Sequence, residues 1–179
     1  MLSTKGAIRV RVYLPATTTA LRTLVDVGTL AGPHTAFAVT PQLREFYELS
    51  NAEADVEELE YAALLAAARA SLRLIDNDPT AARRRVVVAA DVPDGAVRPI
   101  DDPDTDRGAA RVETDIRVGD VASAHIDGTD AEDDVRAAVN VVIEADLGSE
   151  DAQFIVDQAE GHELAWYASQ EMGPALDLL

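Results

Sequence analysis

The stretch RRRVVVAADVP, residues 83–93, decides which fold the chain adopts. Its centre, Val86–Ala90, is apolar at every position, whereas a strand with one solvent-exposed face alternates apolar and polar residues. A continuous apolar run of this length is typical of a central strand that is covered on both faces. The sequence therefore predicts a sheet with helices packed on it.

Three arginines, Arg83, Arg84 and Arg85, stand directly before that run and form the only basic cluster in the chain. Such a cluster can hold an anion or a carboxylate group. The chain has 33 acidic and 15 basic residues. We expect the three arginines to form ion pairs with the protein's own acids.

Two strands and three helices are predicted before residue 83. The stretch AIRVRVYLP (7–15) alternates apolar and polar side chains, as a strand with one buried face does. Thr40 followed by Pro41 begins a helix, because the hydroxyl caps free amides and proline at the first helical position needs no donor. The other predictions are a helix after the threonines 17–19, a strand at 34–40 and a long helix that ends near Ile75.

The part of the chain after residue 93 begins with an acidic segment. Residues 94–109 are rich in Asp, Pro and Gly without periodicity, which predicts a flexible acidic loop. Two strands follow, at 110–118 and 121–126; Thr129 with Glu132 then makes a capping box before a helix, and Ser149 can cap the last helix. The predicted order is β-α-β-α-α-β-β-β-α-α, an α+β fold with a single sheet of about five strands in one domain, residues 1–179.

The closing stretch HELAWYASQEM, residues 162–172, is interpreted as helical. On a helix, a mixed aromatic and polar arc faces one way, while apolar residues occupy the opposite side. The stretch begins like the zinc-peptidase pattern His-Glu-x-x-His, but a tryptophan stands where the second histidine is needed. We expect the aromatic residues to be buried; the alternative is a binding surface for a partner or ligand. The residues of this candidate site are His162, Glu163, Trp166, Tyr167 and Gln170.

The acidic loop holds a second candidate site. Asp102, Asp104 and Asp106 stand at positions one, three and five of a calcium-binding loop, and Glu113 falls at position twelve. Position six holds Arg107 where the sharp turn requires glycine, and no helix pair flanks the loop. We therefore expect a solvent-facing acidic loop that binds calcium weakly or not at all.

Three histidines, His34, His125 and His162, are the remaining candidates for a metal or catalytic site. Nothing in the sequence brings them together, and each is expected to have a hydrogen-bonded structural role. The chain also has no glycine-rich phosphate loop, no Gly-x-Ser-x-Gly elbow and no dinucleotide fingerprint.

The sequence therefore favours a non-enzymatic binding or regulatory module that engages a protein or a small ligand and needs no cofactor. The alternative is a small hydrolase or metal-dependent enzyme whose His, Asp and Glu groups converge only in the fold. One pocket that holds two or more of His34, His125, His162, Glu163 and Asp157 would favour the enzyme.

Composition narrows the class of partner and the compartment. A formal net charge of -18 repels phosphate backbones, so a nucleic-acid partner is not expected. No apolar stretch reaches the length of a membrane span, so no membrane association is expected either. The chain has no cysteine, which excludes disulfides and thiolate metal sites. We expect a cytoplasmic protein.

Four stretches carry a resemblance that covers nearly the whole chain: TAFAVTPQLREFY (35–47), EYAALLAAARASLRLI (60–75), RRVVVAADVP (84–93) and HELAWYASQE (162–171). Together they resemble a family of uncharacterised actinobacterial proteins of about this length. The family has no assigned activity, so the resemblance implies no catalytic residues. It implies a stand-alone cytoplasmic bacterial protein.

Overall fold

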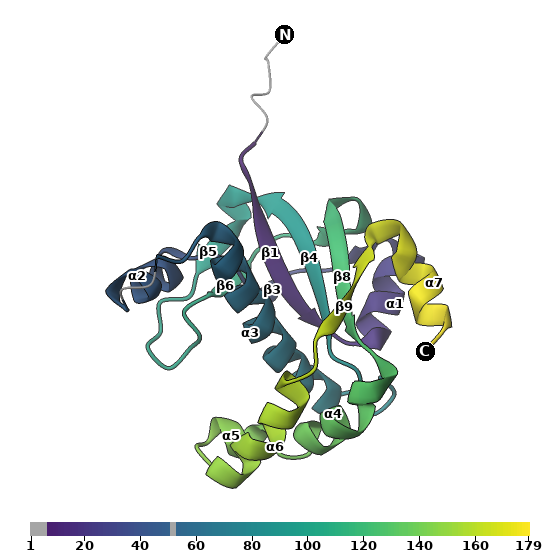
Figure 1. The fold of residues 1–179 in the computed structure, drawn as a ribbon. Helices are drawn as coiled ribbons and strands as arrows, with labels where there is room; N and C mark the ends of the chain where they lie inside the picture. Colours follow the sequence, from purple (N-terminus) through teal and green to yellow (C-terminus); the bar gives the residue numbers. More distant parts are fainter. Residues whose placement is uncertain (1–6, 51–52) are drawn as a thin grey trace.

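The computed structural model describes residues 7–50 and 53–179 and has a seven-stranded antiparallel sheet at its centre (Figure 1). The strand order is β5-β6-β3-β1-β4-β8-β9, and two further short strands, β2 and β7, pair with each other. The α+β prediction is confirmed, but the sheet has more strands than the five expected. The strands are β1 (Arg9–Ala16), β2 (Thr29–Leu30), β3 (His34–Phe37), β4 (Val86–Pro93), β5 (Val97–Pro99), β6 (Ala109–Val112), β7 (Ile116–Arg117), β8 (Val121–Asp127) and β9 (Leu164–Ala168).

Strand β4 is the central, doubly covered strand that the apolar run predicts. It pairs with β1 on one side and β8 on the other. Val86 and Val88 pack into a cluster with helices α1 (Thr18–Val27) and α7 (Met172–Asp177) on one face of the sheet. Val87 and Ala89 pack under helix α3 (Val56–Asp76) on the other face. Burial of alternate side chains on both faces explains why no polar residue interrupts the run.

The helices cover the two faces unequally. In Figure 1, α3 crosses the front of the sheet, α1 lies behind β8 and β9, and α7 stands next to α1 at the right. The last turns of α3 carry Leu72 and Ile75, which pack against a small bundle of α4 (Glu132–Val139), α5 (Val142–Asp146) and α6 (Glu150–Glu160). Helix α2 (Pro41–Leu49) projects beside β5 and β6 (Figure 1). The β8–β9 end of the front face is left exposed, and Trp166 on it is 61% exposed.

Local capping explains several helix boundaries. The Thr40 hydroxyl accepts from the Leu43 amide at the start of α2, as the Thr-Pro pair predicts. The Ser149 hydroxyl accepts from the Ala152 amide and begins α6. Gly28 ends α1 with a φ of 88°, a left-handed conformation that glycine adopts at little cost. None of the helices in the described ranges is long and apolar enough to cross a membrane.

Two of the three clustered arginines, Arg84 and Arg85, form the expected ion pairs with acids of the protein. Arg85 and Asp127 are each 1% exposed, and the Arg85 guanidinium donates to both carboxylate oxygens at 2.8 and 2.7 Å. Arg85 also donates to the His162 carbonyl oxygen at 2.9 Å. Arg84 pairs with Glu132 at 3.0 Å. The cluster therefore fastens β4 to β8 and to the chain that enters β9.

The helical interpretation of HELAWYASQEM is wrong. Residues Leu164–Ala168 form the edge strand β9, Ser169–Glu171 form a 3-10 turn, and Met172 begins helix α7. Antiparallel pairing with β8 places Trp166 opposite His125 and Tyr167 opposite Ala124. Hydrogen bonds to β8 outweigh the local helix propensity of this alanine-containing stretch, because tertiary context overrides propensity. The prediction that Trp166 is buried is therefore also wrong.

The acidic segment 94–109 is more regular than predicted. Asp94–Ala96 forms a 3-10 turn, and β5 pairs with β6. At its far end, the Gly108 carbonyl oxygen accepts from the Ala38 amide at 2.8 Å. Backbone pairing with β6 orders residues that carry no apolar periodicity of their own.

Two other predicted elements are interrupted. The strand expected at 110–118 is divided into β6 and β7, and the helix expected after Thr129 is divided at Asn140–Val141 into α4 and α5. Residues 1–6 and 51–52 of the predicted domain 1–179 lie outside the described part of the chain, and the single-domain assignment stays a prediction.

Candidate functional site

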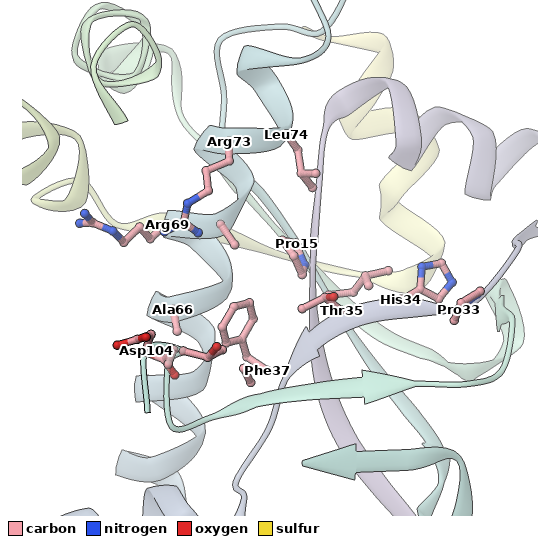
Figure 2. Close-up of a pocket in the computed structure, with 15 residues that line it drawn as sticks. Pro15, Pro33, His34, Thr35, Phe37, Ala66, Arg69, Arg73, Leu74 and Asp104 are labelled. Carbon is pink, nitrogen blue, oxygen red and sulfur yellow. The ribbon is translucent and has the colours of Figure 1, made fainter. Parts of the chain in front are cut away.

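A cleft of about 840 Å³ opens between α3, β3 and the loop that precedes β6 (Figure 2). Most of its floor and one wall are apolar: Leu14 and Pro15 of β1, Phe37 of β3, and Ala66, Ala70 and Leu74 of α3. Its volume lies in the range of small-molecule binding sites, which are concave and largely apolar with a few polar groups.

The polar groups of the cleft come from three segments. Arg69 and Arg73 stand four residues apart, on one face of α3. Asp104 and Asp106 come from the acidic loop, and His34 is the first residue of β3. Figure 2 shows Asp104 near Phe37 and Ala66, with His34 at the opposite end of the cleft.

The two arginines are already paired with acids of α5 and α6. Arg69 donates to Glu160 at 3.0 Å and to Asp146 at 3.2 Å, and Arg73 donates to Asp146 at 2.6 and 3.0 Å. The hydrogen bond from Arg73 is the main cause that lowers the pKa of Asp146. Asp146 in turn raises the pKa of Arg73 through the same contact, with smaller contributions from the charges of Asp106 and Glu160. These pairs fasten α3 to the α5–α6 hairpin.

The acids of the loop leave the cleft with excess negative charge. Asp146 and Glu160 balance Arg69 and Arg73, whereas the ion pairs formed among the described residues do not include Asp104. Asp106 accepts a hydrogen bond from the Gly108 amide at 2.8 Å, which holds its carboxylate in place at the rim. The cleft therefore combines an apolar floor with an acidic rim.

His34 has a fixed tautomer in its neutral form. Its Nε2 lies 3.2 Å from the Leu30 carbonyl oxygen, and a carbonyl oxygen can only accept, so Nε2 is the donor. Nδ1 then remains as an acceptor. The hydrogen-bond partner of His34 is a backbone carbonyl oxygen and not a side-chain nucleophile.

The five residues of the HELAWYASQEM site do not converge. Trp166 lies on the α3 face of β9, and Tyr167 lies on the opposite face against the α1–α7 core. His162 precedes the strand, and its Nε2 lies 2.7 Å from an Asp134 carboxylate oxygen. Glu163 directly precedes β9 and Gln170 follows it in the sequence, and both side chains are exposed. Alternation along a strand, and not a helical arc, separates these side chains.

The four acids of the calcium-like loop are also not gathered. Asp102 accepts from the Asp104 amide at 2.9 Å, and Asp104 and Asp106 line the cleft. Glu113 follows β6, and its amide donates to the Ala96 carbonyl oxygen at 2.8 Å. Within residues 7–50 and 53–179, no group of three or more His, Cys, Asp or Glu residues is placed to hold a metal ion.

A second, smaller hollow of about 240 Å³ lies on the exposed front face beside β9. We call it the Trp166 surface; it is lined by Arg11, Tyr13, Glu57, Glu60, Tyr61, Leu64, Ala89, Ser123, His125 and Trp166. The hollow holds His125, whereas the cleft holds His34. His34 and His125 therefore line different hollows.

Trp166→Ala is expected to change the free energy of unfolding by less than about 1 kcal/mol, because an exposed side chain contributes little to the core. The parent protein should emit as a water-exposed indole, and Trp166 is the only tryptophan that contributes. Urea denaturation and fluorescence of the folded protein test both points. A blue-shifted emission in the native state would show that the indole is buried.

His125 should make the fold less stable at mildly acidic pH. Burial is the main cause that lowers its pKa below 6.5, and the charge of Arg11 contributes. The unfolded chain therefore takes up this proton at a higher pH than the folded protein does, so stability falls as the pH drops below 6.5. His125→Gln should reduce the stability difference between about pH 7 and about pH 5.5, measured by urea denaturation. An unchanged difference would contradict the assignment.

Sequence patterns missed Arg69 and Arg73 as site residues. Both lie in the long Ala- and Leu-rich helix, four residues apart, among side chains that are otherwise small or apolar there. A basic pair on the face of such a helix is a detectable signal, but its acidic partners lie about 70 to 90 residues later. The sequence does single out Asp104 and Asp106, but as candidate calcium ligands and not as the acidic rim of a cleft.

Comparison with known proteins adds the family and no activity. No curated protein matches the chain, and no solved structure does. A family model matches residues 10–176, which is nearly the whole sequence and agrees with the extent of the resemblance. The chain belongs to the family of unknown function DUF6912.

Proposed function

We propose that the protein is a non-enzymatic binding module whose cleft takes a small amphipathic ligand with a cationic group. One observation carries the proposal: the cleft has an apolar floor and an acidic rim whose charge the neighbouring arginines do not balance. An alkyl or aromatic body would cover Phe37 and Leu74, and an ammonium group would meet Asp104 and Asp106.

The enzyme alternative has less support. It requires two or more of the histidines, Glu163 and Asp157 in one pocket. The cleft lining, as far as the structure describes it, holds His34 alone of this set. His162 is tied to Asp134 outside the cleft. A binding role needs only the concave surface and its charges.

A matched pair of ligands tests the proposal. Hexylamine and hexanoate carry the same alkyl chain with opposite charges, and each is titrated against the protein by calorimetry. We expect hexylamine to bind with a dissociation constant on the order of 1 mM, which suits so small a ligand. Hexanoate should bind at least about tenfold more weakly, because the rim repels it. Equal or tighter binding of hexanoate, or binding of neither, would refute the proposal.

Two variants locate the charge that selects the amine. Asp104→Asn with Asp106→Asn removes the rim charge and keeps side chains of the same size, so hexylamine affinity should fall. Asp133→Asn is the control, because this carboxylate is 97% exposed on α4 and does not line the cleft. Loss of affinity in the control, or none in the double variant, would place the amine elsewhere.

Two further features belong to the proposal. We infer a cytoplasmic location, which the complete absence of cysteine supports. An actinobacterial origin rests on the resemblance together with the arginine-rich basic residues, of which Lys5 is the only lysine.

A further inference from the structure

The two edges of the sheet differ in how well they are protected. At one edge, β5 is three residues long and contains Arg98 and Pro99, two features that discourage pairing with another strand. At the other edge, β9 has the sequence Leu-Ala-Trp-Tyr-Ala, without charge, proline or glycine. In the part of the chain that the structure describes, no strand pairs with the outer edge of β9. An edge of this kind is a template for an added strand.

The exposed edge of β9 is held in shape at both ends. The His162 carbonyl oxygen accepts from buried Arg85, and the Ala168 amide donates to the Glu171 carboxylate at 2.8 Å. In an antiparallel pair, every second residue of β9 forms its backbone hydrogen bonds with β8. The N–H and C=O groups of the residues between them point away from β8, toward the outer edge. A partner would meet a strand that is already ordered, which lowers the entropy cost of binding.

We propose that the outer edge of β9 binds an extended, basic segment of a protein partner, which adds to the sheet as a further strand. The site is separate from the cleft and adds a protein partner to the small ligand proposed above. Strand addition supplies affinity through backbone hydrogen bonds, and the side chains beside the edge supply the preference for a basic segment.

Trp166 and Leu164 lie on the front face of β9 and define what the added strand would contact. Leu164 packs against the cluster under α3, and Trp166 stands in the open beside it. Every second side chain of an added strand points to this same face. A lysine or arginine there would lie over the indole, where a cation is attracted by the ring.

The charges of the Trp166 surface and the net charge of the chain favour a basic occupant over a second copy. Arg11 in the Trp166 surface is bound to Asp91 at 2.7 and 3.0 Å, which offsets part of its charge. Glu57 and Glu60 of the same surface form no ion pair with any residue that the structure describes. A second copy would bring a chain of net charge -18 against its equal, whereas a basic segment is attracted.

The negative charge of Glu60 acts at the inner end of the Trp166 surface, beside β1. Burial is the main cause that raises the pKa of Tyr13; the charge of Glu60 raises it further, and Arg11 opposes this through its charge and a hydrogen bond. A long basic side chain that extends from the edge over Trp166 would point toward this acid.

Three capped heptapeptides test the proposal on the full chain: one alternates Lys and Val, one alternates Glu and Val, and one is the Lys/Val peptide with N-methylated backbone amides. Trp166 is the only tryptophan, so its emission reports binding at this edge. We expect the Lys/Val peptide to change the emission, and to bind at least about tenfold more tightly than either other peptide. Its affinity should fall with added salt.

Variants separate the edge from the rest of the surface, with binding followed by calorimetry. Glu57→Gln with Glu60→Gln should weaken Lys/Val binding by about tenfold and reduce its salt dependence. Trp166→Ala should weaken it by a similar factor. Phe46→Ala is the control, because Phe46 is an exposed aromatic side chain on α2 outside the Trp166 surface, and it should leave the affinity unchanged.

Four results would overturn the proposal. Equal binding of the Glu/Val peptide would exclude selection by charge, and equal binding of the N-methylated peptide would exclude strand addition. No binding of the Lys/Val peptide would leave the edge without this class of partner. A dimer in sedimentation that Trp166→Ala dissociates would show that a second copy occupies the edge.

Discussion

Asp127→Ala lowers the free energy of unfolding by about 3–5 kcal/mol, the expected cost of removing one partner from a buried ion pair. Asp127 accepts hydrogen bonds from the Arg85 backbone amide and from two guanidinium nitrogens at 2.7 to 2.8 Å. Arg85 is 1% exposed, so the substitution leaves a full positive charge without water or counter-ion. Urea denaturation measures the loss.

The control for Asp127→Ala is the same substitution at an exposed carboxylate. Asp133 pairs with Arg136 at 2.9 Å, but its side chain is 97% exposed. Asp133→Ala should therefore change stability by less than about 1 kcal/mol. If Asp127→Ala fails to fold, Asp127→Asn keeps the shape and some of the hydrogen bonds and should still lose stability. Loss of less than about 1 kcal/mol in both Asp127 variants would show that the pair does not hold β4 and β8 together.

Leu72→Ala has the second largest expected effect, a loss of about 3 kcal/mol. Leu72 is 0% exposed and packs with Ile75 into the cluster that joins α3 to α4, α5 and α6. The substitution removes apolar contacts and leaves a cavity. The ion pairs between α3 and the α5–α6 hairpin hold these helices in place, so they cannot move together to fill it. Thermal or urea unfolding gives the size of the effect.

Leu74→Ala is the matched control on the same helix. Leu74 is 39% exposed and lines the cleft. Its truncation should cost less than about 1 kcal/mol of stability and should weaken hexylamine binding, because it removes part of the apolar floor. A loss at Leu74 equal to that at Leu72 would mean that the cleft side of α3 is packed as tightly as the bundle side.

Some elements could be predicted from the sequence because their own residues determine their structure. Val86–Ala90 indicates a doubly covered strand because every side chain in it is apolar, and β4 is that strand. Thr40 and Pro41 mark the start of α2 because capping involves neighbouring residues alone. In both cases the deciding interaction is local or depends only on burial.

Elements that depend on a distant partner could not be predicted. The five residues of β9 are apolar on both faces, so they fit a helix as well as a strand, and pairing with β8 decides between them. A strand of three residues such as β5 is too short to show a period, and pairing with β6 orders it. In both cases, hydrogen bonds to a strand distant in the sequence determine the conformation.

The candidate site shows the same division. Asp104 and Asp106 could be picked out by their spacing, and they do line a cleft. The floor beneath them combines Leu14, Phe37 and Leu74, which come together only through the order of the sheet and the path of α3. No sequence period connects such residues, so the cleft could not be foreseen.

Chemical-shift mapping locates the bound amine on the protein. Hexylamine is titrated into ¹⁵N-labelled protein, and backbone amide shifts are followed residue by residue. We expect shifts confined to the end of β1, β3, the second half of α3 and the segment 102–109, with Thr35 and Thr105 among the residues affected. Shifts centred on β9 or on α2, or no saturable shifts at all, would contradict the proposed binding site.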